Sequence, residues 1–267
     1  MKNKVLISIC LIAIVSACQK KDKTVDTITE DPIKVDSAKE ISFMTSDSIK
    51  IIGDLYELDK ADPIILLFHQ GGSNARAEYG TIIPKLVDKG FNVLATDQRM
   101  GGQIFGNYNR TLTHISDHNF GNPYGFCDAY NNLESALDFV ISSGFTGKKI
   151  IWGSSYSATL AIQLANKNQG KIDGVLAFSP ATGRAMKDCL SSPYFETLKV
   201  PLLVLRPPNE MEDENVQAQF ELAKANGHQT YAAKYGVHGS SMLVKERVKN
   251  DVSENWKVVH TFLEQIR

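Results

Sequence analysis

A serine, a carboxylic acid and a histidine occur in that order along the sequence, each beyond a predicted strand. The candidates are Ser155, Glu210 and His238, and each lies in a turn or loop rather than within a predicted element. Neutral imidazole can take a proton from a serine hydroxyl and return it to a leaving group. A carboxylate fixes the tautomer of that imidazole and stabilises its charged form. These residue types therefore indicate acyl transfer through a nucleophilic serine.

The residues around Ser155 favour it over the neighbouring Ser154 as the nucleophile. Residues 152–158 link a predicted strand to a predicted helix, and the positions two before and two after Ser155 are small, Gly153 and Ser157. Small residues there let strand and helix approach closely while the turn lifts the central hydroxyl above the sheet. With Ser154 as the nucleophile, bulky aromatic residues would occupy those two positions.

Three neighbouring acids are candidates for the carboxylate. Glu210 lies a few residues beyond the strand predicted at 202–205. Glu212 and Asp213 are its rivals, and their alternative role is to favour the N-terminus of the helix predicted at 213–226. Glu210 matches the place where many hydrolases of the fold that this sequence resembles carry their acid, so we predict Glu210 and leave its two neighbours open.

A glycine pair after an earlier strand is suited to bind the negative oxygen of an acyl-transfer intermediate. The residues at 69–73 are His-Gln-Gly-Gly-Ser, and they follow the apolar run at 64–68. Backbone N–H groups aimed at this oxygen stabilise it. The loop resembles the HGGG-type loop of esterases, which implies that it supplies one donor, the N–H of Gln70 with Gly71 as the alternative. The other donor is expected to be the N–H of Tyr156, at the positive end of its helix. The Gln70 side chain would then point toward the substrate, and a plain turn is the other interpretation of the glycines.

The remaining histidines have other predicted roles. His69 belongs to the glycine loop and is expected to brace it. His114 and His118 have a spacing that binds zinc when it occurs on a helix, but the Gly and Asn residues around them favour a loop. His228 is expected at the start of a strand and His260 on the last helix. We therefore predict no metal site and no cofactor.

Strands alternate with helices from residue 39 onward, and this pattern must position the candidate residues. Strands are predicted at 40–44, 49–58, 64–68, 91–96, 149–152, 174–178, 202–205 and 229–234, and helices at 75–88, 128–142 and 156–166, at 213–226 and near the C-terminus. Such alternation implies an α/β fold, with a mostly parallel sheet, an N-terminal antiparallel hairpin and helices on both faces. Ligands bind at the carboxyl ends of such strands, where the serine, acid and histidine are expected.

These motifs resemble those of the α/β-hydrolase superfamily. The residues at 153–157, Gly-Ser-Ser-Tyr-Ser, are similar to its G-x-S-x-G motif, with Ser157 in place of the second glycine. The loop at 69–73 resembles the HGGG-type loop of esterases, and the residues at 97–101 look like its D-x-R-x-G segment, where Asp and Arg hold loops together. The resemblance covers residues 39–267, and within the superfamily it is to dienelactone-hydrolase-like esterases.

The resemblance implies the α/β-hydrolase fold and a serine hydrolase with Ser155, Glu210 and His238 as catalytic triad. A carboxylic ester, either a small molecule or a polymer fragment, is the expected substrate. A peptidase or amidase would use the same triad, although the chain lacks the propeller or large cap of many such peptidases. A non-catalytic binding protein with a hydrolase fold is the second alternative, but such proteins usually lose a triad member.

Two long segments beyond predicted strands are expected to shape the pocket. Residues 100–127 carry several aromatic residues among Gly and Asn, and residues 180–199 carry others. They include Phe105, Tyr108, Phe120, Tyr124 and Phe126 in the first segment, and Met186, Tyr194 and Phe195 in the second. Because both follow strands at the active edge of the sheet, we expect these side chains to form pocket walls or to anchor the loops.

The first residues predict the cellular compartment. Lys2 and Lys4 come before a largely apolar run at 5–15, which is too short to cross a bilayer, and small residues lead from it to Cys18. A charged start, a short apolar core and small residues before a cut site are typical of a secretory signal. The residues at 15–18, Val-Ser-Ala-Cys, also look like a bacterial lipobox, in which Cys18 carries the lipid.

This interpretation divides the chain into three parts. We expect a lipoprotein signal peptide at 1–18, a flexible tether at 19–38 and one hydrolase domain at 39–267. The polar tether cannot bury enough surface to offset the entropy of ordering it. Because lipid chains replace a spanning helix, we expect a lipid-anchored protein of the bacterial cell envelope, facing the periplasm or the outer surface.

Cysteine use and charge add two further expectations. Cys10 would leave with the signal peptide and Cys18 would be lipidated, so that Cys127 and Cys189 remain. Thiols in an oxidising compartment can pair, and we predict a disulfide that joins two loops, with two free thiols as the alternative. The formal net charge is −1, and no basic stripe suggests nucleic-acid binding.

Overall fold

The computed structural model describes residues 38–115 and 123–267. The predicted signal peptide, the lipidation site Cys18 and all but the last residue of the predicted tether therefore lie outside the described residues, and so do His118 and Phe120. Within the described part of the chain, no helix is both long and apolar enough to cross a membrane.

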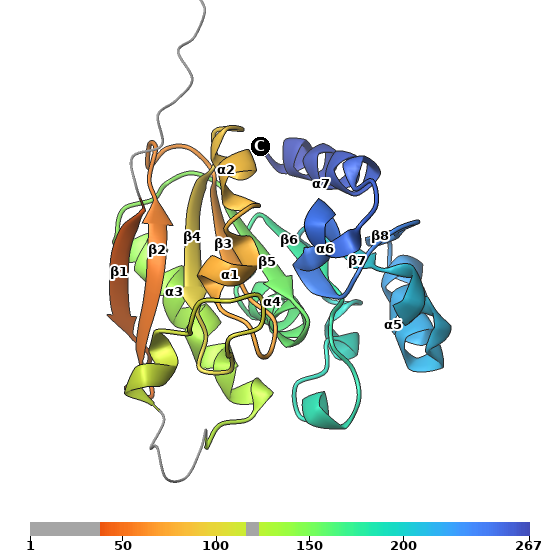
Figure 1. Ribbon diagram of the computed structural model, residues 1–267, viewed down its shortest axis with the longest axis horizontal. Helices are drawn as coiled ribbons and strands as arrows, with labels where there is room; N and C mark the ends of the chain where they lie inside the picture. The colour runs from red at the N-terminus through yellow and green to blue at the C-terminus, as the bar shows by residue number, and fades with distance from the viewer. Residues whose placement is uncertain (1–37, 116–122) are drawn as a thin grey trace, which may run out of the picture. The chain divides into compact units, whose positions relative to one another are not determined.

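Eight strands of the described chain form one sheet, in the order β1-β2-β4-β3-β5-β6-β7-β8 (Figure 1). Their bounds are β1 Lys39–Met44, β2 Lys50–Tyr56, β3 Ile64–Phe68, β4 Asn92–Asp97, β5 Lys149–Ser154, β6 Gly174–Phe178, β7 Leu202–Arg206 and β8 Gln229–Ala232. Strand β2 is antiparallel to both β1 and β4, and all other neighbours are parallel. The predicted mostly parallel sheet with an antiparallel hairpin at its start is confirmed.

Helices cover both faces of this sheet. They are α1 Ala75–Tyr79, α2 Ile83–Val87, α3 Tyr130–Ser142, α4 Tyr156–Lys167, α5 Glu214–Ala225, α6 Lys245–Val248 and α7 Ser253–Ile266. Apolar residues of α3, α4 and α5 pack in one core cluster, and those of α1, α2 and α7 pack in the other. The sheet is therefore the middle of three layers.

Strand β3 shows why the central strands read as uninterrupted apolar runs. Ile64, Leu66 and Phe68 belong to the cluster with α3 and α4, whereas Ile65 and Leu67 belong to the cluster with α1 and α7. Successive side chains of a strand point to opposite faces, so the side chains of β3 meet apolar neighbours on both faces of the sheet. All five residues are fully buried.

The single helix predicted at 75–88 is instead two short helices, α1 and α2. Asn74 caps α1 as predicted, since its side chain accepts a hydrogen bond from the Ala77 N–H. Pro84 lies in the first turn of α2 and has no N–H to donate to the carbonyl of Gly80, so one continuous helix would lose a bond there. The break leaves α1 as a separate element beside the glycine loop at 69–73.

Candidate active site

Ser155 occupies a strained turn between β5 and α4. Its backbone has φ 61° and ψ −122°, outside the conformations that side-chain-bearing residues ordinarily adopt. Backbone bonds to the segment around the end of β6 help to hold it there, because the Ser155 N–H donates to the Phe178 carbonyl over 2.8 Å and the Ser155 carbonyl accepts from the Ala181 N–H over 3.1 Å. A side chain at Gly153 would come within 2.5 Å of the Ala158 Cα, so glycine is needed where the strand passes the helix.

The rival serine, Ser154, has a structural role. It is fully buried, and its Oγ accepts a hydrogen bond of 3.0 Å from the Ser240 N–H. Ser155 is partly exposed, and its hydroxyl makes no hydrogen bond to any described residue, His238 included. Catalytic hydrogen bonds in ligand-free sites are often long and tighten only when substrate binds. The structure therefore leaves the Ser155 hydroxyl, and not that of Ser154, available for attack.

Ser157 replaces the second glycine of the motif without disturbing the turn. It is fully buried, and its hydroxyl donates to the His69 carbonyl over 2.7 Å. This bond joins the first turn of α4 to the end of β3. The departure from the G-x-S-x-G pattern thus adds a link between the serine turn and the glycine loop.

Glu210 and His238 meet beyond β7 and β8. Nδ1 of His238 lies 2.5 Å from Oε1 of Glu210. A carboxylate accepts the Nδ1 proton, and this tautomer leaves Nε2 as the basic nitrogen. The His238 side chain is 49% exposed, whereas that of Glu210 is 14% exposed. Burial alone would raise the pKa of Glu210, but hydrogen bonds from His238 and Arg206 outweigh it and hold that pKa below its ordinary value.

The rival acids lie elsewhere. Asp213 is the N-cap of α5, and its carboxylate accepts from the N–H groups of Asn215 over 2.8 Å and Val216 over 3.2 Å. Glu212 is exposed. Of the three acids considered from the sequence, the structure brings Glu210 to His238.

The loop that carries His238 is held against the strand that carries the serine turn. The Gly239 N–H donates to Ser179 Oγ over 2.9 Å, and the next N–H donates to Ser154 Oγ. Gly239 has φ +68°, and a Cβ there would overlap Ser154 Oγ and lie 2.8 Å from Gln70 Oε1. Only glycine lets this backbone approach β5 so closely, and the approach brings the histidine loop beside Ser155.

The first assignment of an oxyanion donor is wrong. The N–H of Gln70 donates to Oε2 of Glu78 over 2.8 Å, so it is not free for a substrate oxygen. The N–H groups of Gly71 and Tyr156 donate to none of the described residues. Gly71, the alternative, is therefore the available donor of the loop. The Gln70 side chain does not point toward substrate either; it is 7% exposed, and its Oε1 lies beside Gly239.

His69 braces the glycine loop from below. It is fully buried, its Nδ1–H donates to the Gln70 carbonyl over 2.8 Å, and its Nε2 accepts from the Gln98 N–H over 2.8 Å. Burial lowers the pKa of His69, which keeps the ring neutral and suits one donor and one acceptor. The predicted bracing role is the one that these contacts support.

His228 and His260 make contacts away from this site. His228 bonds the Phe195 carbonyl over 2.7 Å, and His260 stacks on Trp256. Over residues 38–115 and 123–267, no group of three or more His, Cys, Asp or Glu side chains is arranged to hold a metal ion.

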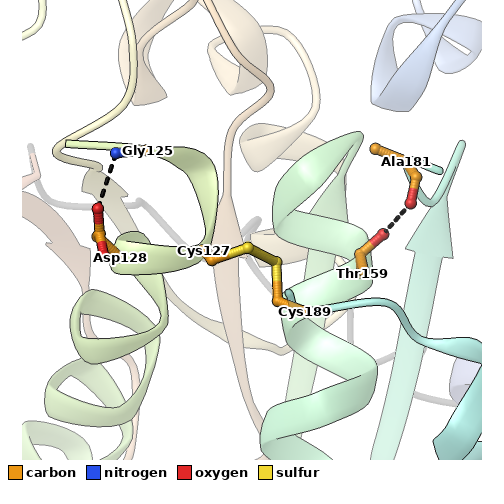
Figure 2. Close-up of a disulfide and its surroundings, with 6 residues drawn as sticks. All are labelled: Gly125, Cys127, Asp128, Thr159, Ala181 and Cys189. Carbon is orange, nitrogen blue, oxygen red and sulfur yellow. Dashed lines mark hydrogen bonds between the residues drawn. A yellow bond between two sulfur atoms is a disulfide. The ribbon is translucent and has the colours of Figure 1, made fainter. Parts of the chain in front are cut away.

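A disulfide joins the two segments that were expected to shape the pocket. Figure 2 shows Cys127, in the 3-10 helix Phe126–Ala129, bonded to Cys189. The S–S distance is 2.08 Å. The neighbouring Phe126 stacks on the Tyr156 ring, with 4.9 Å between centroids, and a Cβ on Gly71 would lie 3.1 Å from it. The disulfide therefore fixes an aromatic wall beside both proposed N–H donors.

Not all of the expected pocket walls face a pocket. Met186 and Phe195 are each 1% exposed and belong to the core cluster around α4, so they anchor their loop. Phe105 is exposed, and its ring centroid lies 3.8 Å from Cζ of Arg247. Phe126, in contrast, stacks on Tyr156 and lies beside Gly71.

Sequence reasoning missed two residues of this site. Arg206 ends the otherwise apolar strand β7, and a charged residue in a doubly covered strand was the signal that could have found it. Glu78 lies on the buried side of α1 between Ala77 and Tyr79, and an acid amid residues that pack into the core was a weaker signal. Arg206 binds Glu210, and Glu78 binds Gln70, two residues that the sequence did single out.

The fold is similar to that of solved esterases and hydrolases. An esterase of Pyrococcus furiosus has 19% identity and a TM-score of 0.63, covering 86% of this chain and 91% of that one. A thermostable carboxyl esterase of Bacillus coagulans, solved with glycerol, has 13% identity and a TM-score of 0.65, covering 86% and 99%. A dienelactone hydrolase of Anabaena variabilis has 14% identity and a TM-score of 0.61, covering 86% and 99%.

These similarities, together with the strand order, show that the chain has the α/β-hydrolase fold. No protein-family model matches the sequence, and no curated protein matches it either. At such low identities the likeness extends to the fold alone, so the reaction must be argued from the site.

Proposed function

We propose that this protein is a serine hydrolase that cleaves carboxylic esters through an acyl-enzyme on Ser155. The observation that carries the proposal is the strained turn at Ser155 beside a loop whose His238 is hydrogen-bonded to Glu210. Strain of this kind persists only where the surrounding structure imposes it, and it is concentrated at functional sites. The esterases among the structures of similar fold support the same reaction class.

In the proposed acylation step, Ser155 is the nucleophile and His238 transfers the proton. Oγ of Ser155 attacks the carbonyl carbon while its proton passes to Nε2 of His238. Glu210 stabilises the imidazolium that forms, and the N–H groups of Gly71 and Tyr156 receive the negative oxygen. When the carbon–oxygen bond to the alcohol breaks, the alcohol takes the proton from His238 and the acyl group stays on Ser155.

Deacylation repeats these steps with water as the nucleophile. Water gives a proton to Nε2 of His238 and attacks the acyl carbon, and the same two N–H groups bind the oxyanion. The bond to Oγ then breaks, Ser155 recovers its proton from His238, and the carboxylic acid leaves. The half-exposed His238 side chain lets water reach the acyl-enzyme.

The oxyanion donors should account for a large share of the rate acceleration over the uncatalysed reaction. One such donor contributes about 3 kcal/mol to transition-state stabilisation. The Tyr156 N–H lies in the first turn of α4, a helix of 12 residues, where the helix dipole adds positive potential. The Tyr156 side chain is anchored separately, since its hydroxyl donates to the Met100 carbonyl over 2.8 Å.

The experiment that tests this function compares the wild type with Ser155→Ala on short-chain p-nitrophenyl esters and on aminoacyl anilides. We expect ester turnover that the substitution abolishes. Turnover of anilides alone would replace the esterase with an amidase on the same residues. Equal turnover by both proteins would exclude Ser155 as the nucleophile. No turnover by either protein would favour a binding protein with a hydrolase fold.

We also propose that the enzyme acts at the bacterial cell envelope, anchored by lipid on Cys18. The support is the charged start, short apolar run and small residues before Cys18. Mass spectrometry of the protein purified from membranes should find diacylglycerol on Cys18. Release of Cys18→Ser into the soluble fraction would agree, whereas an unchanged membrane fraction would contradict the anchor.

A further inference from the structure

Glu78 is a buried acid that the proposed triad does not use. It lies on α1 and has no exposed surface. Its Oε2 accepts the Gln70 N–H over 2.8 Å, while its Oε1 is buried with no hydrogen-bond partner among the described residues. A buried carboxyl with one orphaned oxygen carries a free-energy cost, which selection tolerates where the group has a task.

Glu78 binds the glycine loop at the residue just before the available oxyanion donor. The Gln70 carbonyl is held from the other side, by the His69 Nδ1–H at 2.8 Å and the Ser73 N–H at 3.3 Å. In a trans peptide the carbonyl and the following N–H point in opposite directions. Fixing both the N–H and the carbonyl of Gln70 therefore fixes the direction of the Gly71 N–H.

Helix α1 is itself tied to the loop that carries His238. Arg247 donates from Nη1 to the Glu78 carbonyl over 3.1 Å and to Ser241 Oγ over 3.0 Å. The hydroxyl of the next residue, Tyr79, donates to the Phe68 carbonyl at the end of β3 over 2.8 Å. The Glu78 carboxyl thus projects from an element anchored to both the glycine loop and the histidine loop.

We propose that Glu78 is a positioning residue that orients the Gly71 N–H in the oxyanion hole by holding the Gln70 N–H. This inference rests on the proposed function, because the oxyanion hole exists only if Ser155 forms an acyl-enzyme. Holding the Gln70 N–H requires a side chain that is long enough to reach it and that ends in a hydrogen-bond acceptor. It does not require a negative charge. A charge this close to the oxyanion would oppose it, and burial raises the pKa of Glu78, which favours the neutral acid.

Two substitutions of Glu78 separate the acceptor from the charge. Glu78→Gln keeps a side-chain carbonyl that can accept the Gln70 N–H, whereas Glu78→Ala removes the acceptor. With Glu78→Ala we expect kcat to fall about tenfold to a hundredfold, since one misplaced donor weakens transition-state binding, with KM within about twofold. With Glu78→Gln we expect kcat within about threefold of the wild type.

Asn92→Ala is the matched control for lost stability. Asn92 is also a fully buried polar residue, but it lies at the opposite end of the sheet, where its Oδ1 accepts the Leu58 N–H over 2.7 Å. Its replacement should lower the melting temperature and leave kcat near the wild-type value. If Glu78→Ala does not fold, Glu78→Met should be tested instead, because it keeps the side-chain volume and removes the acceptor.

The outcomes separate this inference from the proposed function. Ser155-dependent ester turnover in the wild type, with kcat lost in Glu78→Ala and restored in Glu78→Gln, supports both. The positioning role is overturned if Glu78→Ala behaves like Asn92→Ala, or if Glu78→Gln loses as much kcat as Glu78→Ala. Only an absence of Ser155-dependent turnover in the wild type overturns the function itself, and the positioning role with it.

Discussion

Arg206 donates from Nη1 to Oε2 of Glu210 over 2.7 Å. The other oxygen of that carboxylate faces His238, so the acid is held on both sides. Arg206 is 2% exposed, and its second terminal nitrogen, Nη2, bonds the Pro180 carbonyl and the side chain of Gln219. This buried guanidinium thus orients the proposed catalytic acid and links it to the segment beyond β6.

The first prediction concerns the identity of the acid. Glu210→Gln should lower kcat by about a thousandfold to ten-thousandfold, because the tautomer of His238 and its charged form lose their support. It should also destabilise the protein by about 3 kcal/mol, since Arg206 would be left buried without its partner. Ester turnover and urea denaturation of the same samples measure both effects.

Asp213→Ala is the control for that prediction. It should cost about 1 kcal/mol through loss of the α5 N-cap and leave turnover within about twofold. A large loss of kcat in Asp213→Ala, with turnover kept in Glu210→Gln, would assign the acid to Asp213.

The second prediction follows from the lowered pKa of Glu210. A carboxylate with a lowered pKa stabilises the fold above its unfolded pKa of about 4.3, and this contribution is lost as the pH falls through the folded pKa. Arg206→Met removes one of the two hydrogen bonds that lower this pKa. The difference in melting temperature between the wild type and Arg206→Met should therefore be largest near pH 7 and narrow below about pH 4. A difference that is constant from pH 3 to pH 7 would show that the pair contributes no pH-dependent stability.

The third prediction is that Glu78 contributes a pH dependence of stability opposite in sign to that of Glu210. Its pKa is raised in the folded protein by burial, so the folded state binds its proton more tightly than the unfolded state. Stability is then present below the unfolded pKa and decreases as the pH rises above about 4.3 toward the folded pKa. The melting temperature of Glu78→Gln should therefore rise relative to that of the wild type as the pH increases over that range. A constant offset between the two proteins from pH 4 to pH 9 would contradict a raised pKa.

The fourth prediction concerns the disulfide. Cys127 and Cys189 are 62 residues apart, and a crosslink over a loop of this length stabilises a protein by about 2–4 kcal/mol. Cys127→Ser with Cys189→Ser should lose this amount in urea denaturation. KM for esters should rise, because Phe126 would no longer be fixed against Gly71 and Tyr156. If reduction of the wild type changes neither stability nor KM, the disulfide does not shape the site.

Much of the fold follows from local sequence because its central strands are buried on both faces. Strands β3 and β6 coincide with the predicted 64–68 and 174–178, where apolar runs end abruptly at turn residues. The Ser155 turn follows from small residues at fixed positions. Helix α6 was not predicted, since four residues are too few to show a helical period.

The way that the chain folds back on itself after a strand accounts for what the sequence did not reveal. The Gln70 N–H is occupied only because α1 folds back and places Glu78 against it, and no local pattern encodes that contact. Arg206 likewise lies within reach of Glu210 because the turn after β7 reverses over it. Residue type and order predicted the groups that we propose to react, and tertiary packing decides which backbone N–H groups stay free.

The most direct test of the central claim is labelling of the full-length protein by a fluorophosphonate, which reacts only with an activated serine. Wild type, Ser155→Ala and Ser154→Ala should be compared at equal concentration after their folding is checked. Label on the wild type and on Ser154→Ala, with none on Ser155→Ala, is the predicted result. Label that persists on Ser155→Ala would contradict the assignment of Ser155 as the nucleophile.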